Sequence, residues 1–185
     1  MIMYNILILG SGGREHAITW SIYKDNRINK LYCAPGNAGT DQLGKNIDID
    51  VSQKTEILKF VKSNKIDLTI VGPEAPLQDG IVDLFLSEKE LIFGPSKKAA
   101  QIETSKVWAK IMMIKYNIPT AEFFSFNDFT SAEKFILSQK KSSWVIKADG
   151  LAAGKGVILS NNKEESINAL KQILIEKRFG NAGNK

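Results

Sequence analysis

The sequence predicts an α/β protein that consists of an open parallel sheet followed by a smaller, mixed α+β part. Two observations predict the open sheet: short apolar runs end at glycines, and segments with apolar residues three and four apart separate these runs. A third observation predicts the second part, because after Pro95 the order changes to strand, glycine-rich loop, strand and helix. We place the first domain over residues 1–104 and the second over residues 105–185.

The first domain is expected to alternate strands and helices. Its first strand is the almost uninterrupted apolar run at 5–9, which ends at Gly10 and is typical of a parallel strand covered on both faces. The later strands are each expected to end at a loop rich in glycine and proline. These strands are predicted at 30–34, 67–71 and 91–93, and the helices over 14–24, from a Ser52 cap to Val61, and from Leu77 to Phe85.

The second domain has a different order of elements. A helix over 104–116 should end before Pro119, because the residue before a proline avoids the helical region. Thr130 and Glu133 have the spacing of a capping box, which predicts the start of another helix. The remaining strands are predicted at 122–126, 144–147 and 157–159, and a last helix is predicted to begin at Asn162 and to carry Ile167, Leu170 and Leu174 on one face.

Composition excludes several classes of protein. Hydrophobic residues make up 43% of the chain and charged residues 24%, which is ordinary for a globular protein and excludes a disordered or collagen-like chain. The net charge of +5 comes from residues 94–185, which carry +7, whereas residues 1–93 carry −2. Lysines spread over helix faces are typical of a solvated surface, so we predict no nucleic-acid partner. The single cysteine excludes an internal disulfide, and no run approaches the roughly 20 apolar residues of a membrane span. We expect a cytoplasmic monomer.

Three loops follow strands of the predicted parallel sheet, at 10–16, 34–40 and 72–77. The carboxyl ends of parallel strands meet at one edge of a sheet, where helix N-termini present backbone N–H groups. These N–H groups and Arg14 suit a phosphate, whereas the carboxylates of the loops suit sugar hydroxyls or an amine. The sequence therefore predicts a site for a small ligand that carries both phosphate and hydroxyl groups.

A dinucleotide-dependent oxidoreductase is the alternative interpretation of the first loop. Gly10 and Gly12 would begin the G-x-G-x-x-G fingerprint, but Glu15 stands where its last glycine should be, and no acidic residue ends the second strand. His16, the only histidine, lies just inside the predicted helix N-terminus, where a structural or second-shell role and acid–base chemistry are both open. No cysteine or second histidine is near it in the sequence, so we predict no metal site there.

The second informative segment is 145–157, in which Lys147 ends an apolar strand and a loop with three glycines follows. A lysine at the end of an apolar strand is costly to desolvate unless an anion pairs with it. The segment lacks the G-x-x-x-x-G-K-[ST] pattern of a P-loop and leads into a strand. We interpret it as a flap that closes over nucleotide phosphates, with Lys147 and Lys155 neutralising charge; the alternative is a glycine-rich hairpin without a ligand.

Taken in order, these segments resemble the phosphoribosylamine–glycine ligase (glycinamide ribonucleotide synthetase) family of ATP-grasp enzymes. The resemblance extends over the whole chain. The segments that carry it are 10–17, 34–40, 71–77, 92–95, 105–106, 118–121 and 145–157. It implies a Rossmann-like PreATP-grasp domain followed by the first part of an ATP-grasp module with its glycine-rich lid.

The resemblance also implies an activity. Members of this family join glycine to 5-phosphoribosylamine, with ATP and Mg²⁺ or Mn²⁺, through a glycyl phosphate, to give glycinamide ribonucleotide, ADP and phosphate in purine biosynthesis. For phosphoribosylamine it implies binding by Gly12, Gly13, Arg14, Glu15, Asn37, Gly39, Thr40 and Glu74. For ATP it implies binding by Lys106, Lys147, Asp149, Gly150, Leu151, Ala152, Gly154, Lys155 and Gly156.

The family's metal ligands, its acidic pair at the adenine and ribose, and its catalytic residues are expected beyond Lys185. We therefore expect an N-terminal portion of such a ligase, inactive by itself. The alternatives are a stand-alone module that binds a nucleotide or phosphosugar, and another ATP-grasp carboxylate–amine ligase. The loop at 12–16 favours the phosphoribosylamine enzyme over the latter.

Overall fold

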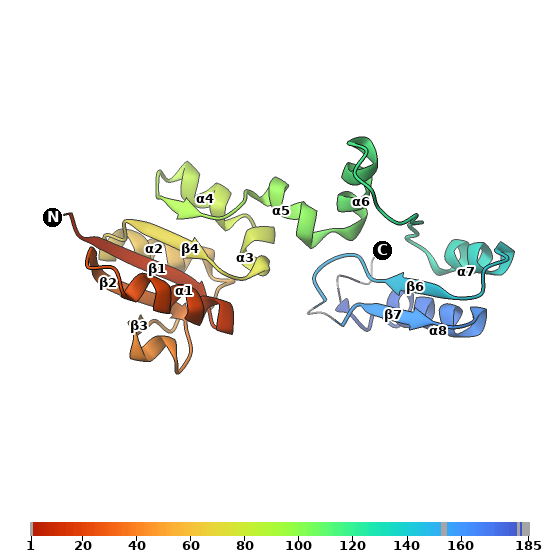
Figure 1. Cartoon of the computed structure of the whole chain (residues 1–185), viewed down its shortest axis with the longest axis horizontal. Coiled ribbons are helices and arrows are strands. Elements are labelled where there is room, and N and C mark those ends of the chain that lie inside the picture. The colour runs from red at the N-terminus through yellow and green to blue at the C-terminus, as the bar shows by residue number, and fades with distance from the viewer. Residues whose placement is uncertain (1, 153–154, 181, 183–185) are drawn as a thin grey trace. The chain divides into compact units, whose positions relative to one another are not determined.

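The computed structural model describes residues 2–152, 155–180 and 182 of the chain. The chain divides into two compact units, Met1–Ala100 and Gln101–Lys185, which we call the first and the second unit (Figure 1). The division falls inside helix α5 (Lys97–Thr104). The domain boundary between residues 104 and 105 stays a prediction.

The first unit contains a five-stranded parallel sheet of order β3-β2-β1-β4-β5 (Figure 1). Its strands are β1 (Tyr4–Gly10), β2 (Ile28–Pro35), β3 (Lys45–Asn46), β4 (Leu68–Val71) and β5 (Ile92–Phe93). Its helices are α1 (Gly13–Tyr23), α2 (Lys54–Asn64), α3 (Glu74–Gln78) and α4 (Ile81–Ser87), with a short 3₁₀ turn at Thr40–Gln42. This is the open parallel α/β sheet that the sequence predicts, and β1 and β4 end within one residue of their expected ends.

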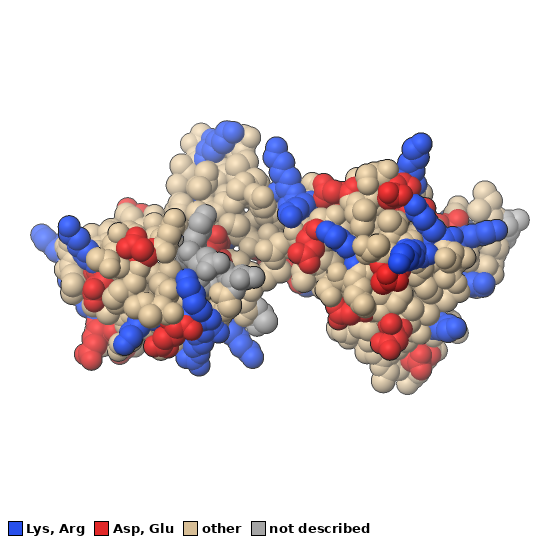
Figure 2. Space-filling model, turned by 180° about the vertical axis from the view of Figure 1, so that it is seen from behind, with Lys and Arg blue, Asp and Glu red and all other residues tan. Residues whose placement is uncertain are grey.

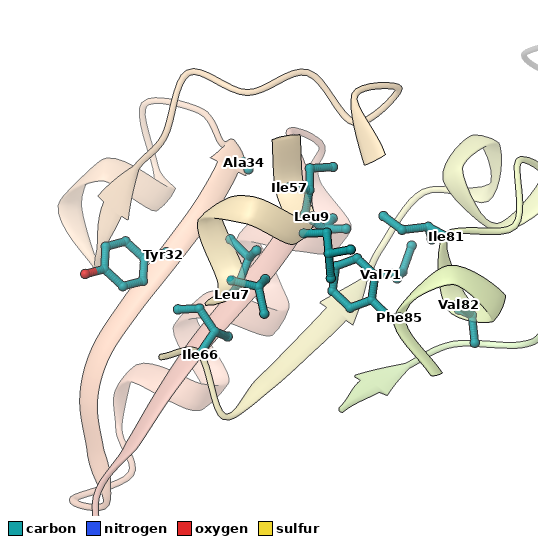
Figure 3. Packing of buried hydrophobic residues seen from close by; sticks show 12 residues of the cluster. Leu7, Leu9, Tyr32, Ala34, Ile57, Ile66, Val71, Ile81, Val82 and Phe85 are labelled. Atoms are coloured by element: carbon teal, nitrogen blue, oxygen red, sulfur yellow. The ribbon is translucent and has the colours of Figure 1, made fainter. Parts of the chain in front are cut away.

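The sheet of the first unit is buried on both faces because its central strands are apolar at almost every position. On one face Leu7, Leu9 and Val71 pack against residues of α2 and α4, and Figure 3 shows Ile57 and Phe85 closing over these strands. On the other face Ile6, Ile8, Leu31 and Cys33 pack against Ile18 and Ile22 of α1. The central strands are thus packed on both faces, and the loops of the site follow directly from their carboxyl ends.

Three details of the first unit differ from the sequence-based prediction. The predicted helix 77–85 is two helices, α3 and α4. Gly80, with a left-handed φ of 80°, interrupts the helical backbone between them. The N-cap of α2 is Gln53 rather than Ser52. Strand β3 was not predicted at all, since two residues carry no periodic pattern.

The second unit contains an antiparallel hairpin covered by two helices. The hairpin is β6 (Trp144–Lys147) and β7 (Val157–Ser160), and the helices of this unit after α5 are α6 (Lys106–Lys115), α7 (Phe129–Ser138) and α8 (Lys163–Leu174). Ile136 of α7 and Leu170 of α8 lie in one apolar cluster with Trp144 and Ile146 of β6. The strand–loop–strand–helix order is confirmed, and Asn162 caps α8 as predicted by accepting a hydrogen bond from the Glu165 N–H.

Other predictions for the second unit were wrong. Residues 122–126 form no strand, although the aromatic rings of Phe124 and Phe126 pack on Phe135. Helix α7 begins at Phe129, and its cap is Asp128, which accepts a hydrogen bond from the Ser131 N–H. The helix predicted over 104–116 is present as α6 and ends before Pro119 as expected, but it begins after the Ser105 cap rather than at Thr104, and α5 was not predicted.

Charged side chains are distributed over the surface. On the face shown in Figure 2, lysines and arginines are interspersed with acidic residues and form no single continuous basic patch. Within the described residues, no helix has the length and apolar character needed to cross a membrane.

Candidate functional site

The first loop of the first unit folds around a buried carboxylate. Gly10 has a φ of 121°, and Gly12 caps α1, so the chain turns sharply from strand to helix. The Glu15 side chain, only 4% exposed, turns back under the loop, and its Oε2 accepts a hydrogen bond of 2.6 Å from the Gly12 N–H. A Cβ at Gly10, where φ is positive, would lie 2.7 Å from Glu15 Cδ, so glycine is required there; a Cβ at Gly12 would lie 2.9 Å from Glu15 Oε2. Glu15 therefore shapes the loop from inside.

The second loop is joined to the first by the amide of Asn37. Its Nδ2 donates to the Ser11 carbonyl at 2.9 Å, and its Oδ1 accepts from the N–H groups of Gly39 and Thr40 at 2.8 and 3.0 Å. Gly39 packs on the imidazole of His16, and a Cβ there would lie 2.5 Å from His16 Cε1. The His16 imidazole thus packs against the second loop, which agrees with the structural alternative for this residue.

The third loop is joined to the first by Arg14. Its Nη1 donates to the Gly72 carbonyl at 2.6 Å and to Glu74 Oε1 at 2.8 Å. The hydrogen bond from Arg14 is the main cause that holds the pKa of Glu74 below its ordinary value. Both side chains remain partly exposed, so a cation and an ionised carboxylate face solvent at the carboxyl ends of β1 and β4.

We expect the Arg14–Glu74 pair to stabilise the fold slightly and only while Glu74 is ionised. Because the pKa of Glu74 is lowered in the folded state, this contribution is present above the unfolded-state pKa of about 4.3 and is lost as the pH falls through the lower folded-state value. Solvent screening limits it to about 0.5 kcal/mol. Urea unfolding of the native chain and Glu74→Gln should show this difference at pH 7, and the difference should shrink as the pH is lowered to 3. A difference that stays constant over that range would exclude the pair as its cause.

The structure brings the predicted phosphosugar residues to one edge of the sheet, but these residues differ in how far they are exposed to solvent. Gly12, Gly13 and the side chain of Arg14 are exposed and Glu74 is partly exposed, whereas the side chains of Glu15 and Thr40 are buried. Their contacts with a ligand remain predictions. Sequence reasoning missed Asn46, which lies beneath the second loop and bonds to both Asn37 and Thr40.

In the second unit, Lys147 lies at the end of β6 on the face of the hairpin that the helices leave open. Val145 is opposite Leu159 and Lys147 is opposite Val157, and all four of these residues are exposed. The desolvation argument made from the sequence therefore does not apply, because Lys147 already faces solvent. The face instead combines an apolar strip with one cation.

The glycine-rich loop is attached to the start of α6. Asp149 accepts hydrogen bonds from the Ser105 hydroxyl at 3.0 Å and from the Val107 N–H at 3.2 Å, and Lys106 Nζ donates to the Gly150 carbonyl at 2.9 Å. Asp149 thus satisfies donors at a helix N-terminus, which favours a carboxylate. The loop brings Lys106, Asp149 and Gly150 into contact.

The remainder of the predicted nucleotide-binding loop is described only in part. Leu151 and Ala152 are half-buried, and Ala152 accepts a hydrogen bond from the Lys155 N–H at 2.8 Å. Lys155 is exposed, and Gly156 returns the chain to β7. Gly154 lies outside the described residues.

Family models match both parts of the chain. The N domain of phosphoribosylglycinamide synthetase matches residues 4–103, and the ATP-grasp (A) domain of the same enzyme matches residues 104–185. The chain belongs to the phosphoribosylglycinamide synthetase family. The two matches meet within α5, one residue before its end.

Individual members of the phosphoribosylglycinamide synthetase family agree with this assignment. A phosphoribosylamine–glycine ligase of Halalkalibacterium halodurans is 46% identical over 97% of this chain and 42% of its own length. One of Caldanaerobacter subterraneus is 47% identical over 97% of this chain and 43% of its own length. The crystal structure of the Thermotoga maritima phosphoribosylamine–glycine ligase is 35% identical, with a TM-score of 0.76 over 96% of this chain and 41% of that one. The chain thus spans about two fifths of the relatives' length.

The described residues contain no cluster of three or more potential metal ligands. No three histidine, cysteine, aspartate or glutamate side chains among these residues come close enough to hold an ion. We therefore assign no ligand of Mg²⁺ or Mn²⁺ to this part of the synthetase family fold.

Proposed function

We propose that this chain supplies the phosphosugar-binding loops and the nucleotide-binding lysines of a cytoplasmic ligase that joins glycine to 5-phosphoribosylamine with ATP. The products are glycinamide ribonucleotide, ADP and phosphate. One observation carries the proposal: in a member of the synthetase family, three loops that bear N–H donors, a cation and a carboxylate are cross-linked at the carboxyl ends of β1, β2 and β4.

In the first unit, phosphoribosylamine would bind across the three loops. The backbone N–H groups at the start of α1 and the guanidinium of Arg14 suit the 5-phosphate, because the N–H dipoles carry partial positive charge and the guanidinium carries a full positive charge. Glu74, ionised at neutral pH, would accept hydrogen bonds from ribose hydroxyls or from the amine. Glu15, Asn37 and Thr40 would act by holding the loops, since their polar atoms already bond to the protein.

In the second unit, ATP would bind on the open face of the hairpin. The strip of Val145, Val157 and Leu159 suits the apolar faces of a base, and Lys147 lies where the strip meets the glycine-rich loop. Lys106 and Lys155 would add positive charge for the phosphates. Lys106 now bonds to the Gly150 carbonyl, so phosphate binding would compete with that hydrogen bond.

The chemistry follows from these two binding roles. Transfer of the ATP γ-phosphoryl group to the glycine carboxylate gives a glycyl phosphate, and the amine of phosphoribosylamine then attacks the acyl carbon and releases phosphate. The loops of the first unit would hold the amine, and the lysines of the second unit would offset the phosphate charge. A divalent metal would be held by groups outside the described residues.

A chimeric enzyme tests this function. Residues 1–185 are joined to the part of the Halalkalibacterium halodurans ligase that follows its matched region, and ADP release and product mass are measured. We expect ADP release that requires glycine and phosphoribosylamine together, and a product with the mass of glycinamide ribonucleotide. The intact relative is the positive control and each part alone is a negative control. A chimera that unfolds cooperatively, and so is folded, yet shows no such turnover would contradict the proposal.

A further inference from the structure

Asn46 lies outside the three loops of the candidate phosphosugar site but bonds to one of them. It lies in β3, at the edge of the sheet, where it is paired with Cys33 of β2. Its side chain points under the second loop, and Gly36, with a φ of 76°, packs directly against it. A Cβ at Gly36 would lie 2.5 Å from Asn46 Cγ, so the loop and this amide are fitted to each other.

Two hydrogen bonds connect Asn46 to the second loop, and a third, between Asn37 and Thr40 within that loop, closes them into a ring. Its Nδ2 donates to the Asn37 carbonyl at 2.8 Å, and its Oδ1 accepts from the Thr40 hydroxyl at 2.7 Å. The Thr40 hydroxyl oxygen accepts in turn from the Asn37 N–H at 2.7 Å. An amide serves here as donor and acceptor at once, which a carboxylate cannot do.

The ring also reaches the first loop. Asn37, whose backbone Asn46 holds, donates from its side chain to the carbonyls of Ser11 and Gly12 at 2.9 and 3.3 Å. The distance between the two loops thus depends on where Asn37 stands, and Asn46 fixes that position.

We propose that Asn46 is a positioning residue for the phosphosugar site. The inference rests on the proposed function, because it assigns the loops that Asn46 holds to phosphoribosylamine. Asn46 does not touch the ligand; it sets Asn37 and Thr40, and through Asn37 it sets the N–H groups of the first loop. Its loss should weaken phosphosugar binding and leave nucleotide binding unchanged.

Isothermal titration of the 185-residue chain with ribose 5-phosphate, and separately with ATP, tests this. Asn46→Asp keeps the shape but places a carboxylate oxygen against the Asn37 carbonyl, so we expect at least a tenfold weaker affinity for ribose 5-phosphate and an unchanged affinity for ATP. Asn46→Ala adds no charge and should also lose affinity for ribose 5-phosphate but not for ATP. It replaces Asn46→Asp in the test if the aspartate variant does not fold.

Asn64→Asp is the matched control. Asn64 Nδ2 donates to the Phe60 carbonyl at 3.0 Å, so this variant also loses an amide-to-carbonyl bond in the first unit, away from the loops. It should bind ribose 5-phosphate as the native chain does. Native affinity in both Asn46 variants, or an equal loss for both ligands, would overturn the positioning role and leave the proposed function standing. A native chain that binds no ribose 5-phosphate would overturn both.

Discussion

Replacing Gly72 with alanine should destabilise the first unit and weaken phosphosugar binding. Gly72 is buried after β4, and a Cβ there would lie 2.5 Å from Glu15 Cγ and 2.6 Å from its Cδ. Glu15 cannot move away without giving up the Gly12 N–H, because its side chain fills the space beneath the loop. Overpacking of this kind costs about 1–3 kcal/mol, and we expect a loss near the upper end of that range.

Urea unfolding and titration with ribose 5-phosphate measure both effects of Gly72→Ala. The affinity should fall at least tenfold, since the displaced carboxylate moves the N–H groups at the start of α1. Gly13→Ala is the control for stability: no atom lies within 4 Å of its added Cβ, and it begins α1, so we expect a stability that is unchanged or up to about 1 kcal/mol higher.

A second substitution tests whether overlap with the Glu15 side chain causes the loss of stability in Gly72→Ala. In the Gly72→Ala background, Glu15→Asp shortens the side chain that the new methyl group overlaps, so it should restore part of the lost stability. Introduced alone, the same change should only destabilise. Additive losses in the double variant would show that the two side chains do not conflict, and would contradict this account of the loop.

Replacing Lys147 with alanine should weaken ATP binding by roughly 10- to 100-fold, which corresponds to about 1.5–3 kcal/mol for a charge-assisted hydrogen bond. Lys147 is exposed on the open face of the hairpin, beside the glycine-rich loop. The substitution removes no apolar contact from the clusters that hold β6 to α7 and α8, so the unfolding free energy should change little.

The same titration with Lys134→Ala provides the control for charge. Lys134 is an exposed lysine of α7 in the same unit, and its loss changes the net charge equally. We expect native ATP affinity for Lys134→Ala and native ribose 5-phosphate affinity for Lys147→Ala. Equal weakening of ATP binding in the two lysine variants would indicate a general charge effect and would remove Lys147 from the site.

The sequence correctly predicted those elements of the fold that depend on residues close together in the chain. The apolar runs of β1 and β4, the Asn162 cap and the Gly-Pro ends of strands each depend on a few neighbouring residues. Helix α5 was missed, and α6 was predicted to begin at Thr104 rather than after Ser105, whose hydroxyl bonds to Asp149, 44 residues further along the chain. Residues 122–126 have the composition of a strand, but their rings pack on α7 and β6 instead.

The candidate site shows the same limit. Glycines, Arg14 and Glu74 could be found from their spacing after strands, because parallel strands bring such loops to one edge. The inward turn of Glu15 could not be predicted, since it depends on Gly72 of another loop. Asn46 gave no signal at all: its role arises from a ring of hydrogen bonds that forms only when β3 pairs with β2.

The central claim is that the first unit binds a phosphosugar and the second binds a nucleotide. Amide ¹H–¹⁵N spectra of the 185-residue chain, recorded with ribose 5-phosphate and then with ATP, test it residue by residue. We predict that ribose 5-phosphate shifts the amides of residues 10–15, 36–40 and 72–74, and that ATP shifts those around Lys106, Lys147 and Asp149. Shifts from both ligands in a single unit, or from neither ligand in the predicted loops, would contradict it.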